Sequence, residues 1–317
     1  MKPPERYKAL LRGEPVDRVA AFPFGFGHFA MLLGHPSLGE IYEKPALSYK
    51  AQLLAREIYG WDQPLFFWSP SFGIGEWGSK YVFPYNPKMM SVTMIDPAVK
   101  TPEEAEKLEV PDPRKDPNMR EALVYMKKAV ENKEMPMFML TGGWLTNLDK
   151  IVEIQTIMRW IRKQPDLLVK LLAKTVEFAV RQAEYICEEV GSDTWIPIEA
   201  TPTDSNTLIS PATFGKIVLP SAIAVHQKVL DLGVPMWFSH YCSNQNGNIN
   251  AGFFEQIPMG KPGIIHFGPE VDLKVTVERF GKRHIVLGNV DPPSIFLQSF
   301  DEAMKLCKAD IEKGKDS

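Results

Sequence analysis

The hydrophobic and polar positions of this chain form short apolar runs separated by longer amphipathic segments. Seven short runs, rich in aliphatic and aromatic residues, are typical of buried strands. They comprise residues 19–24, 64–68, 136–140, 194–199, 235–240, 263–267 and 284–287. Between them, apolar positions recur at helical spacing, most clearly at residues 39–59, 166–190 and 211–232. The pattern therefore predicts strands that alternate with helices.

Strands separated by helices of this length run parallel and are joined by right-handed crossovers. We therefore expect an α/β fold, a (β/α)8 TIM barrel, as a single domain over residues 1–317. Seven strands are one short of closure, so we expect the eighth strand beyond Ser317; the alternative is a barrel that closes in another way. An aromatic-rich insertion follows the second strand, and its segments 80–83 and 91–95 predict a small hairpin.

Composition limits the classes of protein to consider. The formal charge of -3, without a basic run, gives no reason to expect nucleic acid or an acidic membrane surface as a partner. Three well-separated cysteines argue against a disulfide framework and for a reducing compartment. The charged N-terminus lacks the apolar core of a signal peptide, and no run approaches the roughly 18 apolar residues of a membrane span. We expect a cytoplasmic protein; a homodimer is an assembly that the sequence leaves open.

The fifth predicted strand ends in the most informative residues of the chain, His240 and Cys242, before an Asn-rich loop. Residues two apart on an extended segment point to the same side, so the imidazole and the thiol face one point, as Zn²⁺ ligands do. The alternative is that both are core residues. Their position decides between the two, because the carboxyl ends of barrel strands form the rim where barrel enzymes have their active sites.

Other polar residues lie at the same predicted rim. Glu199 ends the fourth strand, and we expect it to be a further zinc ligand or a proton acceptor, with an ion pair to a neighbouring cation as the alternative. His266 ends the sixth strand, and we expect it to contact the substrate. Asn289 and Asp291 follow the seventh strand and are expected, with Glu199, to take part in catalysis. His226, in the middle of a predicted helix, is expected to be structural or exposed.

Aromatic residues gather near these strand ends. Besides His266, the residues expected to line a substrate pocket are Phe24, Phe26, His28, Trp68, Trp144 and Tyr241. Aromatic walls favour a planar ring, each good contact contributing roughly 0.5 to 1.5 kcal/mol beyond the burial of area. The alternative is that these side chains are core and lid packing.

Four ordered motifs together resemble the uroporphyrinogen decarboxylase superfamily. They are residues 5–6 with 13–19, residues 110–113, the run from 209–211 to 219–220, and residues 288–292. The resemblance implies an α/β barrel and one of two chemistries: decarboxylation of a tetrapyrrole, or zinc-dependent methyl transfer to or from a corrinoid protein. The arginine-rich N-terminal segment of the decarboxylases has no counterpart at residues 22–28. Without those arginines, a polycarboxylate substrate lacks its bidentate anchors.

The methyltransferase branch carries a His-x-Cys on the fifth strand, and His240 and Cys242 match it. Its third zinc ligand is usually a Cys after the eighth strand, which this sequence does not reach. The resemblance thus implies methyl transfer to or from the cobalt of a corrinoid (cobalamin). The aromatic residues near the strand ends favour a small methoxylated, aromatic compound as the donor. A corrinoid-binding partner protein would supply that cofactor, because nothing here resembles an Asp-x-His-x-x-Gly segment. The alternatives are a methylcorrinoid:thiol methyltransferase of coenzyme M type, a uroporphyrinogen decarboxylase, and a catalytically silent barrel.

Overall fold

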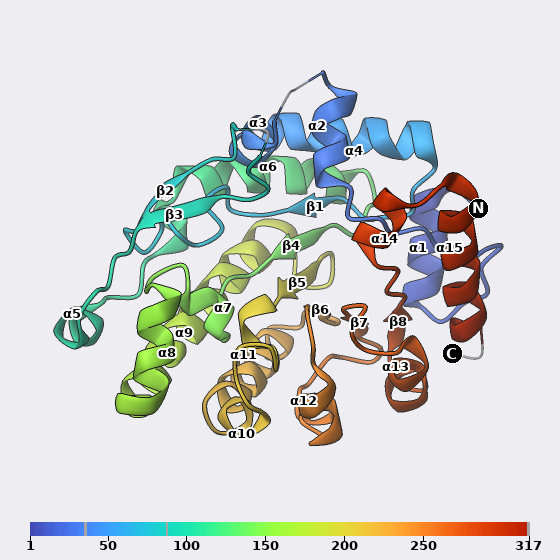
Figure 1. The fold of residues 1–317 in the computed structure, drawn as a ribbon. Helices are drawn as coiled ribbons and strands as arrows, with labels where there is room; N and C mark the ends of the chain where they lie inside the picture. The colour runs from blue at the N-terminus through green and yellow to red at the C-terminus, as the bar shows by residue number, and fades with distance from the viewer. Residues whose placement is uncertain (35–36, 87, 316–317) are drawn as a thin grey trace.

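A computed structural model describes residues 1–34, 37–86 and 88–315, except for the side chains of residues 26 and 27. Its main sheet has six parallel strands in the order β1-β4-β5-β6-β7-β8. Their bounds are β1 Phe66–Phe67, β4 Met137–Met139, β5 Ile196–Ala200, β6 Phe238–Tyr241, β7 Ile264–Phe267 and β8 Ile285–Leu287. In Figure 1 these strands fan across the centre of the molecule. The predicted α/β class, with a parallel sheet, is confirmed.

Helices lie along the outside of this sheet (Figure 1). They are α1 Pro3–Leu11, α2 Phe26–Leu32, α3 Gly39–Glu43, α4 Pro45–Tyr59, α5 Pro102–Lys107, α6 Pro117–Glu131, α7 Leu145–Leu148, α8 Ile154–Lys163, α9 Pro165–Val190, α10 Pro211–Thr213, α11 Leu219–Asp231, α12 Asn246–Asn250, α13 Leu273–Phe280, α14 Pro292–Leu297 and α15 Phe300–Gly314. A π-helical turn, Phe214–Val218, joins α10 to α11. No helix of the described part combines the length and apolar composition that crossing a membrane requires.

Alternation along the strands gives the sheet two apolar faces, because successive side chains of a strand point to opposite sides. One cluster, which we call the inner face, contains Phe66, Met137, Ile198, Phe238 and Ile264. The other, the outer face, contains their neighbours and packs against α6, α8, α9 and α11; its residues on or next to the strands include Phe67, Phe138, Trp237, Ile265 and Phe267. The face on which a residue lies therefore decides whether it reaches the interior or the helix layer.

The first predicted strand, residues 19–24, does not form as a strand. The segment lies beside the approach to β1, where Asp62 donates its backbone N–H to the Ala21 carbonyl at 2.9 Å. A second contact, from the Phe24 N–H to Gln63 Oε1 at 2.9 Å, goes to a side chain, so no strand ladder develops. The eighth strand expected from the sequence remains a prediction.

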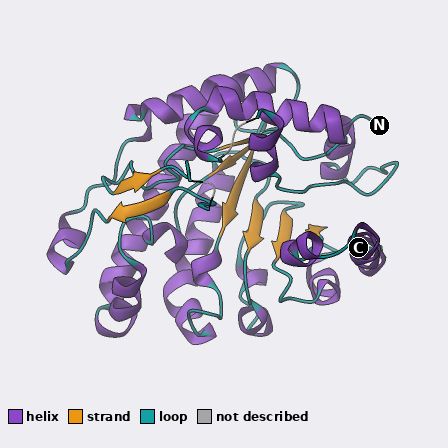
Figure 2. Cartoon of the chain, turned by 45° about the horizontal axis from the view of Figure 1, so that its top comes forward, coloured by secondary structure: helices purple, strands orange, loops and turns teal. Residues whose placement is uncertain are grey.

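The aromatic-rich insertion after β1 contains the expected hairpin. Strands β2 Lys80–Val82 and β3 Thr93–Asp96 are antiparallel, with Tyr81 opposite Met94. Figure 2 shows this hairpin set apart from the main sheet. The insertion therefore emerges from the carboxyl end of β1, at the same edge as the other strand ends.

Candidate active site at the carboxyl ends of the strands

Two histidines meet where β6 and β7 end. His240 and His266 are Cα partners in the parallel ladder, so their side chains share a face of the sheet. That face is the inner one, since His240 lies two residues after Phe238 and its ring centroid is 5.8 Å from that of Phe24. The two Nδ1 atoms are 2.5 Å apart. The sequence predicted that residues at the strand ends share one rim, and these two imidazoles are in contact there.

Burial keeps both imidazoles neutral near pH 7. Desolvation in the apolar surroundings lowers the pKa of His240 to about 4. The pKa of His266 is lowered to about 3, first by burial and then by its proximity to His240. Neutral imidazole is the form that binds metals and accepts protons.

Cys242 follows β6 and is partly buried. Its Sγ lies 3.8 Å from the backbone carbonyl O of His240, to which the thiol donates a weak hydrogen bond. Burial raises the pKa of this thiol to about 12, so it is protonated at neutral pH in the absence of a metal.

The side chains at this site are of the types that bind zinc, but too few of them are grouped to complete a zinc site. Imidazole and thiolate are ligands that Zn²⁺ prefers, and a catalytic zinc site uses three of them. Among the residues that the structure describes, no three or more His, Cys, Asp or Glu side chains are grouped to hold a metal. His240 and Cys242 therefore remain a predicted, incomplete ligand set.

Glu199 is predicted beside this pair, but the structure places it on the outer face. Its carboxylate is buried, with Oε1 2.8 Å from His226 Nε2 and 2.7 Å from Ser239 Oγ. Oε2 accepts a 2.5 Å hydrogen bond from Trp144 Nε1. The reason is register: Ala200, not Glu199, is the Cα partner of His240. We therefore leave Glu199 out of the proposed ligand set.

His226 is the buried partner that reasoning from sequence missed. It is fully buried on α11, with Nδ1 2.7 Å from the carbonyl O of Pro258. Its ring stacks on Trp237, with centroids 4.2 Å apart. The available signal was its helical spacing, because Ala222, His226 and Val229 form one buried stripe.

Two predicted pocket residues, Trp144 and Tyr241, also lie on the outer face. Both are 1% exposed, and their ring centroids are 5.8 Å apart. On the loop after β8, Asn289 donates from Nδ2 to the carbonyls of Gly268 and Val271, at 3.2 and 2.6 Å. Asp291 caps α14 and accepts from the Ser294 backbone N–H at 3.1 Å. The contacts of Trp144, Tyr241, Asn289 and Asp291 described here are therefore structural.

Of the remaining predicted pocket residues, some pack in the inner cluster and one is exposed on the surface. Phe24 and Trp68 pack in the inner cluster, and Trp68 donates from Nε1 to the Tyr42 carbonyl at 3.3 Å. His28 is exposed and contacts the Tyr59 hydroxyl at 2.7 Å from Nε2. The side chain of Phe26 lies outside the described part. Phe24 is thus the predicted aromatic residue that the structure brings to His240.

The inner face is apolar below the two histidines. Its strand residues are Phe66, Met137, Met139, Ile196, Ile198, Ala200, Phe238, Ile264, Ile285 and Leu287, followed at the top by His240 and His266. None of these described strand positions carries Lys or Arg. The strand interior therefore supplies no cation for an anionic substrate.

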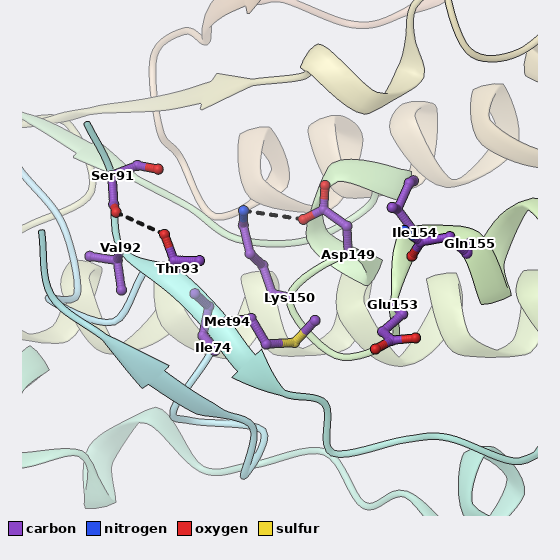
Figure 3. Close-up of a pocket in the computed structure, with 10 residues that line it drawn as sticks. All are labelled: Ile74, Ser91, Val92, Thr93, Met94, Asp149, Lys150, Glu153, Ile154 and Gln155. Atoms are coloured by element: carbon purple, nitrogen blue, oxygen red, sulfur yellow. Dashed lines mark hydrogen bonds and ion pairs between the residues drawn. The ribbon is translucent and has the colours of Figure 1, made fainter. Parts of the chain in front are cut away.

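A separate surface cleft of about 330 Å³ lies between the β2–β3 hairpin and the connection from α7 to α8. Figure 3 shows Lys150 directed at Asp149 there, at 3.1 Å. Its lining residues are Ile74, Ser91, Val92, Thr93, Met94, Asp149, Lys150, Glu153, Ile154 and Gln155. It contains none of the strand-end histidines, and we do not take it as the active site.

The chain belongs to the uroporphyrinogen decarboxylase family, whose description, "Uroporphyrinogen decarboxylase (URO-D)", matches residues 2–317. This match confirms the family resemblance that the four sequence motifs indicated, and it places the chain in a family of enzymes. A uroporphyrinogen decarboxylase of Trichodesmium erythraeum (strain IMS101) is 25% identical over 209 residues. That match covers 64% of this chain and 56% of the relative, little more than half of its length.

The solved structure of a methyltransferase from Methanosarcina mazei has the same fold, with a TM-score of 0.75. The similarity covers 100% of this chain and 90% of the other, at 20% sequence identity. At that identity it establishes the fold and leaves the activity to be argued from the site.

Proposed function

We propose that this chain is a methyltransferase that moves a methyl group between a methoxylated substrate and the cobalt of a corrinoid held by a partner protein. One observation carries the proposal: neutral His240 and His266 meet above an interior whose described strand residues are apolar, and the Cys242 thiol lies against the backbone carbonyl of His240. Such a site suits a soft metal and an uncharged substrate.

The chain's own residues would act by holding and enclosing. His240 and Cys242 would hold zinc, as the family branch with His-x-Cys does, and zinc supplies Lewis acidity toward an ether oxygen or a thiol. Phe24 and the apolar strand residues beneath it would exclude water from the bound substrate. The rim above remains the side from which a corrinoid protein approaches.

Decarboxylation of a uroporphyrinogen is the second candidate. The family description and the curated relative both favour it. Against it, a substrate with several carboxylates needs cationic anchors, which the described inner strand residues lack. A methylcorrinoid:thiol methyltransferase would use the same site with a thiol in place of the ether.

The test is methyl transfer to cobalt in the presence of zinc. Protein with about one zinc per chain, mixed with a methoxylated donor and Co(I) cobalamin or a reduced corrinoid protein, should develop the absorbance of methyl-Co(III). His240→Ala and Cys242→Ser should lose both the zinc and the absorbance change, since each removes a ligand. Zinc is measured by elemental analysis.

Cys187→Ser is the matched control, because Cys187 is also a partly buried thiol but lies on α9. It should keep zinc and activity. Full zinc retention in both site variants would contradict the metal assignment. Release of CO₂ from uroporphyrinogen, with no response to cobalamin, would place the chain with the decarboxylases.

A further inference from the structure

Phe24, whose ring lies beside His240, has a backbone conformation that side chains rarely adopt. Its φ is 49°, in the left-handed region. A bulky residue is strained there and keeps that conformation only where surrounding contacts hold it. The ring is only partly buried, so its packing restrains it less than the packing of a core residue would. A contact to the backbone of Phe24 must therefore contribute.

Two side chains just before β1 make such contacts with the segment that carries Phe24. The Phe24 N–H donates to Gln63 Oε1 at 2.9 Å. The Ala21 N–H donates to Asp62 Oδ2 at 2.8 Å. These side-chain acceptors take the place of the strand ladder that residues 19–24 lack.

The orientation of the Gln63 amide follows from these contacts. A peptide N–H can only donate, so the amide atom that faces Phe24 is the oxygen. The amide nitrogen, Nε2, is buried and has no hydrogen-bond partner among the described residues. Burying such a donor costs stability, and an apolar side chain of similar size would avoid that cost. What Gln63 supplies at this position is therefore the acceptor for Phe24.

We infer that Gln63 is a positioning residue whose amide oxygen fixes the backbone of Phe24 and thereby keeps the Phe24 ring beside His240. The ring centroid is 5.7 Å from that of Phe238 and 5.8 Å from that of His240. Through this ring, Gln63 sets how a bound donor fits the site, although it acts only through Phe24. The effect on the donor rests on the proposed function, whereas the placement of Phe24 does not.

The placement can be measured in metal-free protein, without turnover. An aromatic ring shifts the NMR signals of nearby protons, so the ring-proton signals of His240 report where the Phe24 ring lies. His240→Gln assigns these signals, and Phe24→Leu gives their position without the ring. We expect Gln63→Leu to move them most of the way to that position, because Leu offers no acceptor to the Phe24 N–H.

Gln182→Leu is the matched control. Gln182 is also buried, its Oε1 accepts from the Thr141 N–H at 3.2 Å, and its Nε2 has no partner within the described part of the chain. It lies on α9, in the helix layer, so its substitution should leave the His240 signals unchanged. In a Phe24→Leu background, Gln63→Leu should have no further effect on them, since the two residues act as a unit.

Donor preference gives the second readout. Gln63→Leu should lower the preference for an aromatic over an aliphatic methyl donor about 2- to 10-fold, through KM more than through kcat, as expected for a displaced ring contact. Added to Phe24→Leu, it should lower the preference no further. Absence of methyl transfer in the wild type would contradict the proposed function while the NMR result stood.

Unchanged His240 signals in folded Gln63→Leu would overturn the inference. An equal effect of Gln63→Leu with and without the Phe24 ring would overturn it too, because Gln63 would then act on the structure in general. If the variant fails to fold, the wild type still provides a test by amide hydrogen exchange. The Phe24 amide should exchange far more slowly than in an unfolded peptide, and exchange at the unfolded rate would mean that Gln63 does not hold it.

Discussion

Asp204 shows how strongly one buried carboxyl can couple this fold to pH. It is fully buried in the loop after β5, where Oδ1 accepts from the Leu145 N–H at 2.8 Å. Oδ2 accepts from the backbone N–H of Thr146 at 3.1 Å and from its hydroxyl at 2.8 Å. Burial raises the pKa of Asp204 from 3.8 to about 7, and these three donors oppose part of the rise.

The folded protein therefore binds a proton at Asp204 that the unfolded chain has released between about pH 4 and pH 7. Stability from this group is complete below pH 4 and is lost as the pH rises to about 7. The loss is at most about 4 kcal/mol, at 1.36 kcal/mol for each pKa unit. Urea unfolding at several pH values should show it, and Asp204→Asn should flatten that part of the slope. Exposed Asp193→Asn is the control; an equal slope in Asp204→Asn and wild type would contradict the raised pKa.

The sequence predicted which residues lie at the strand ends. It did not predict on which face of the sheet each of their side chains lies. Position at a strand end identified His240 and His266 as neighbours at the rim, and the ladder pairs them. The same reasoning placed Glu199 with them, although it points to the helix layer. Alternation within one strand can be seen in a sequence, but the register between strands depends on tertiary packing. That is also why the pairing of Glu199 with His226 was missed.

At the scale of elements, α9 and the loop after β4 approach each other closely at Gly142. A Cβ on Gly142 would lie 2.0 Å from the carbonyl O of Thr175 and 2.7 Å from the Cβ of Ala179. The Thr175 atom belongs to helix backbone, which cannot move without shifting the helix. The absence of a side chain at Gly142 therefore sets how near α9 packs to the strand.

Gly142→Ala should lower the free energy of unfolding by about 3 kcal/mol or more, the upper range for overpacking. Gly60→Ala is a matched control, because Gly60 has a φ of 64° at the end of α4 and a Cβ added there would meet nothing within 4 Å. It should cost only about 1 kcal/mol of backbone strain. Urea unfolding of both variants decides: an equal cost would show that α9 moves aside freely.

Elements with strong local signals were predictable, and those that need a distant partner were not. The long helix α9 agrees with the helical spacing expected over residues 166–190. The run at residues 19–24 is as apolar as the other predicted strands, but it forms no ladder of backbone hydrogen bonds with a neighbouring strand. A strand exists only where a neighbour supplies hydrogen bonds, and no local pattern specifies that neighbour.

At the scale of the whole molecule, the two faces of the sheet separate structural aromatics from those that can meet a substrate. Trp144 and Tyr241 fill the layer between sheet and helices. Phe24 packs on the inner face, with its centroid 5.7 Å from Phe238 and 5.8 Å from His240. The aromatic wall expected from the sequence is therefore smaller than predicted, and Phe24 is the described member whose ring contacts His240.

This geometry makes the preference for an aromatic donor testable at one position. If the donor is a methoxylated ring, methyl transfer to Co(I) should be faster from a methoxybenzoate or methoxyphenol than from methanol or methylamines. Phe24→Leu should reduce that preference about 2- to 10-fold, because one ring contact contributes roughly 0.5 to 1.5 kcal/mol.

Phe253→Leu makes the same chemical change at a ring that stacks on Phe214 in the helix layer, and it should leave the preference unaltered. Initial rates with each donor, for the wild type and both variants, provide the comparison. An equal loss of rate on aromatic and aliphatic donors in Phe24→Leu would mean that Phe24 only packs. A wild-type preference for methanol would reject the aromatic donor. The proposal of methyl transfer itself would stand, because His240 and His266 lie above the same apolar interior whatever the shape of the donor.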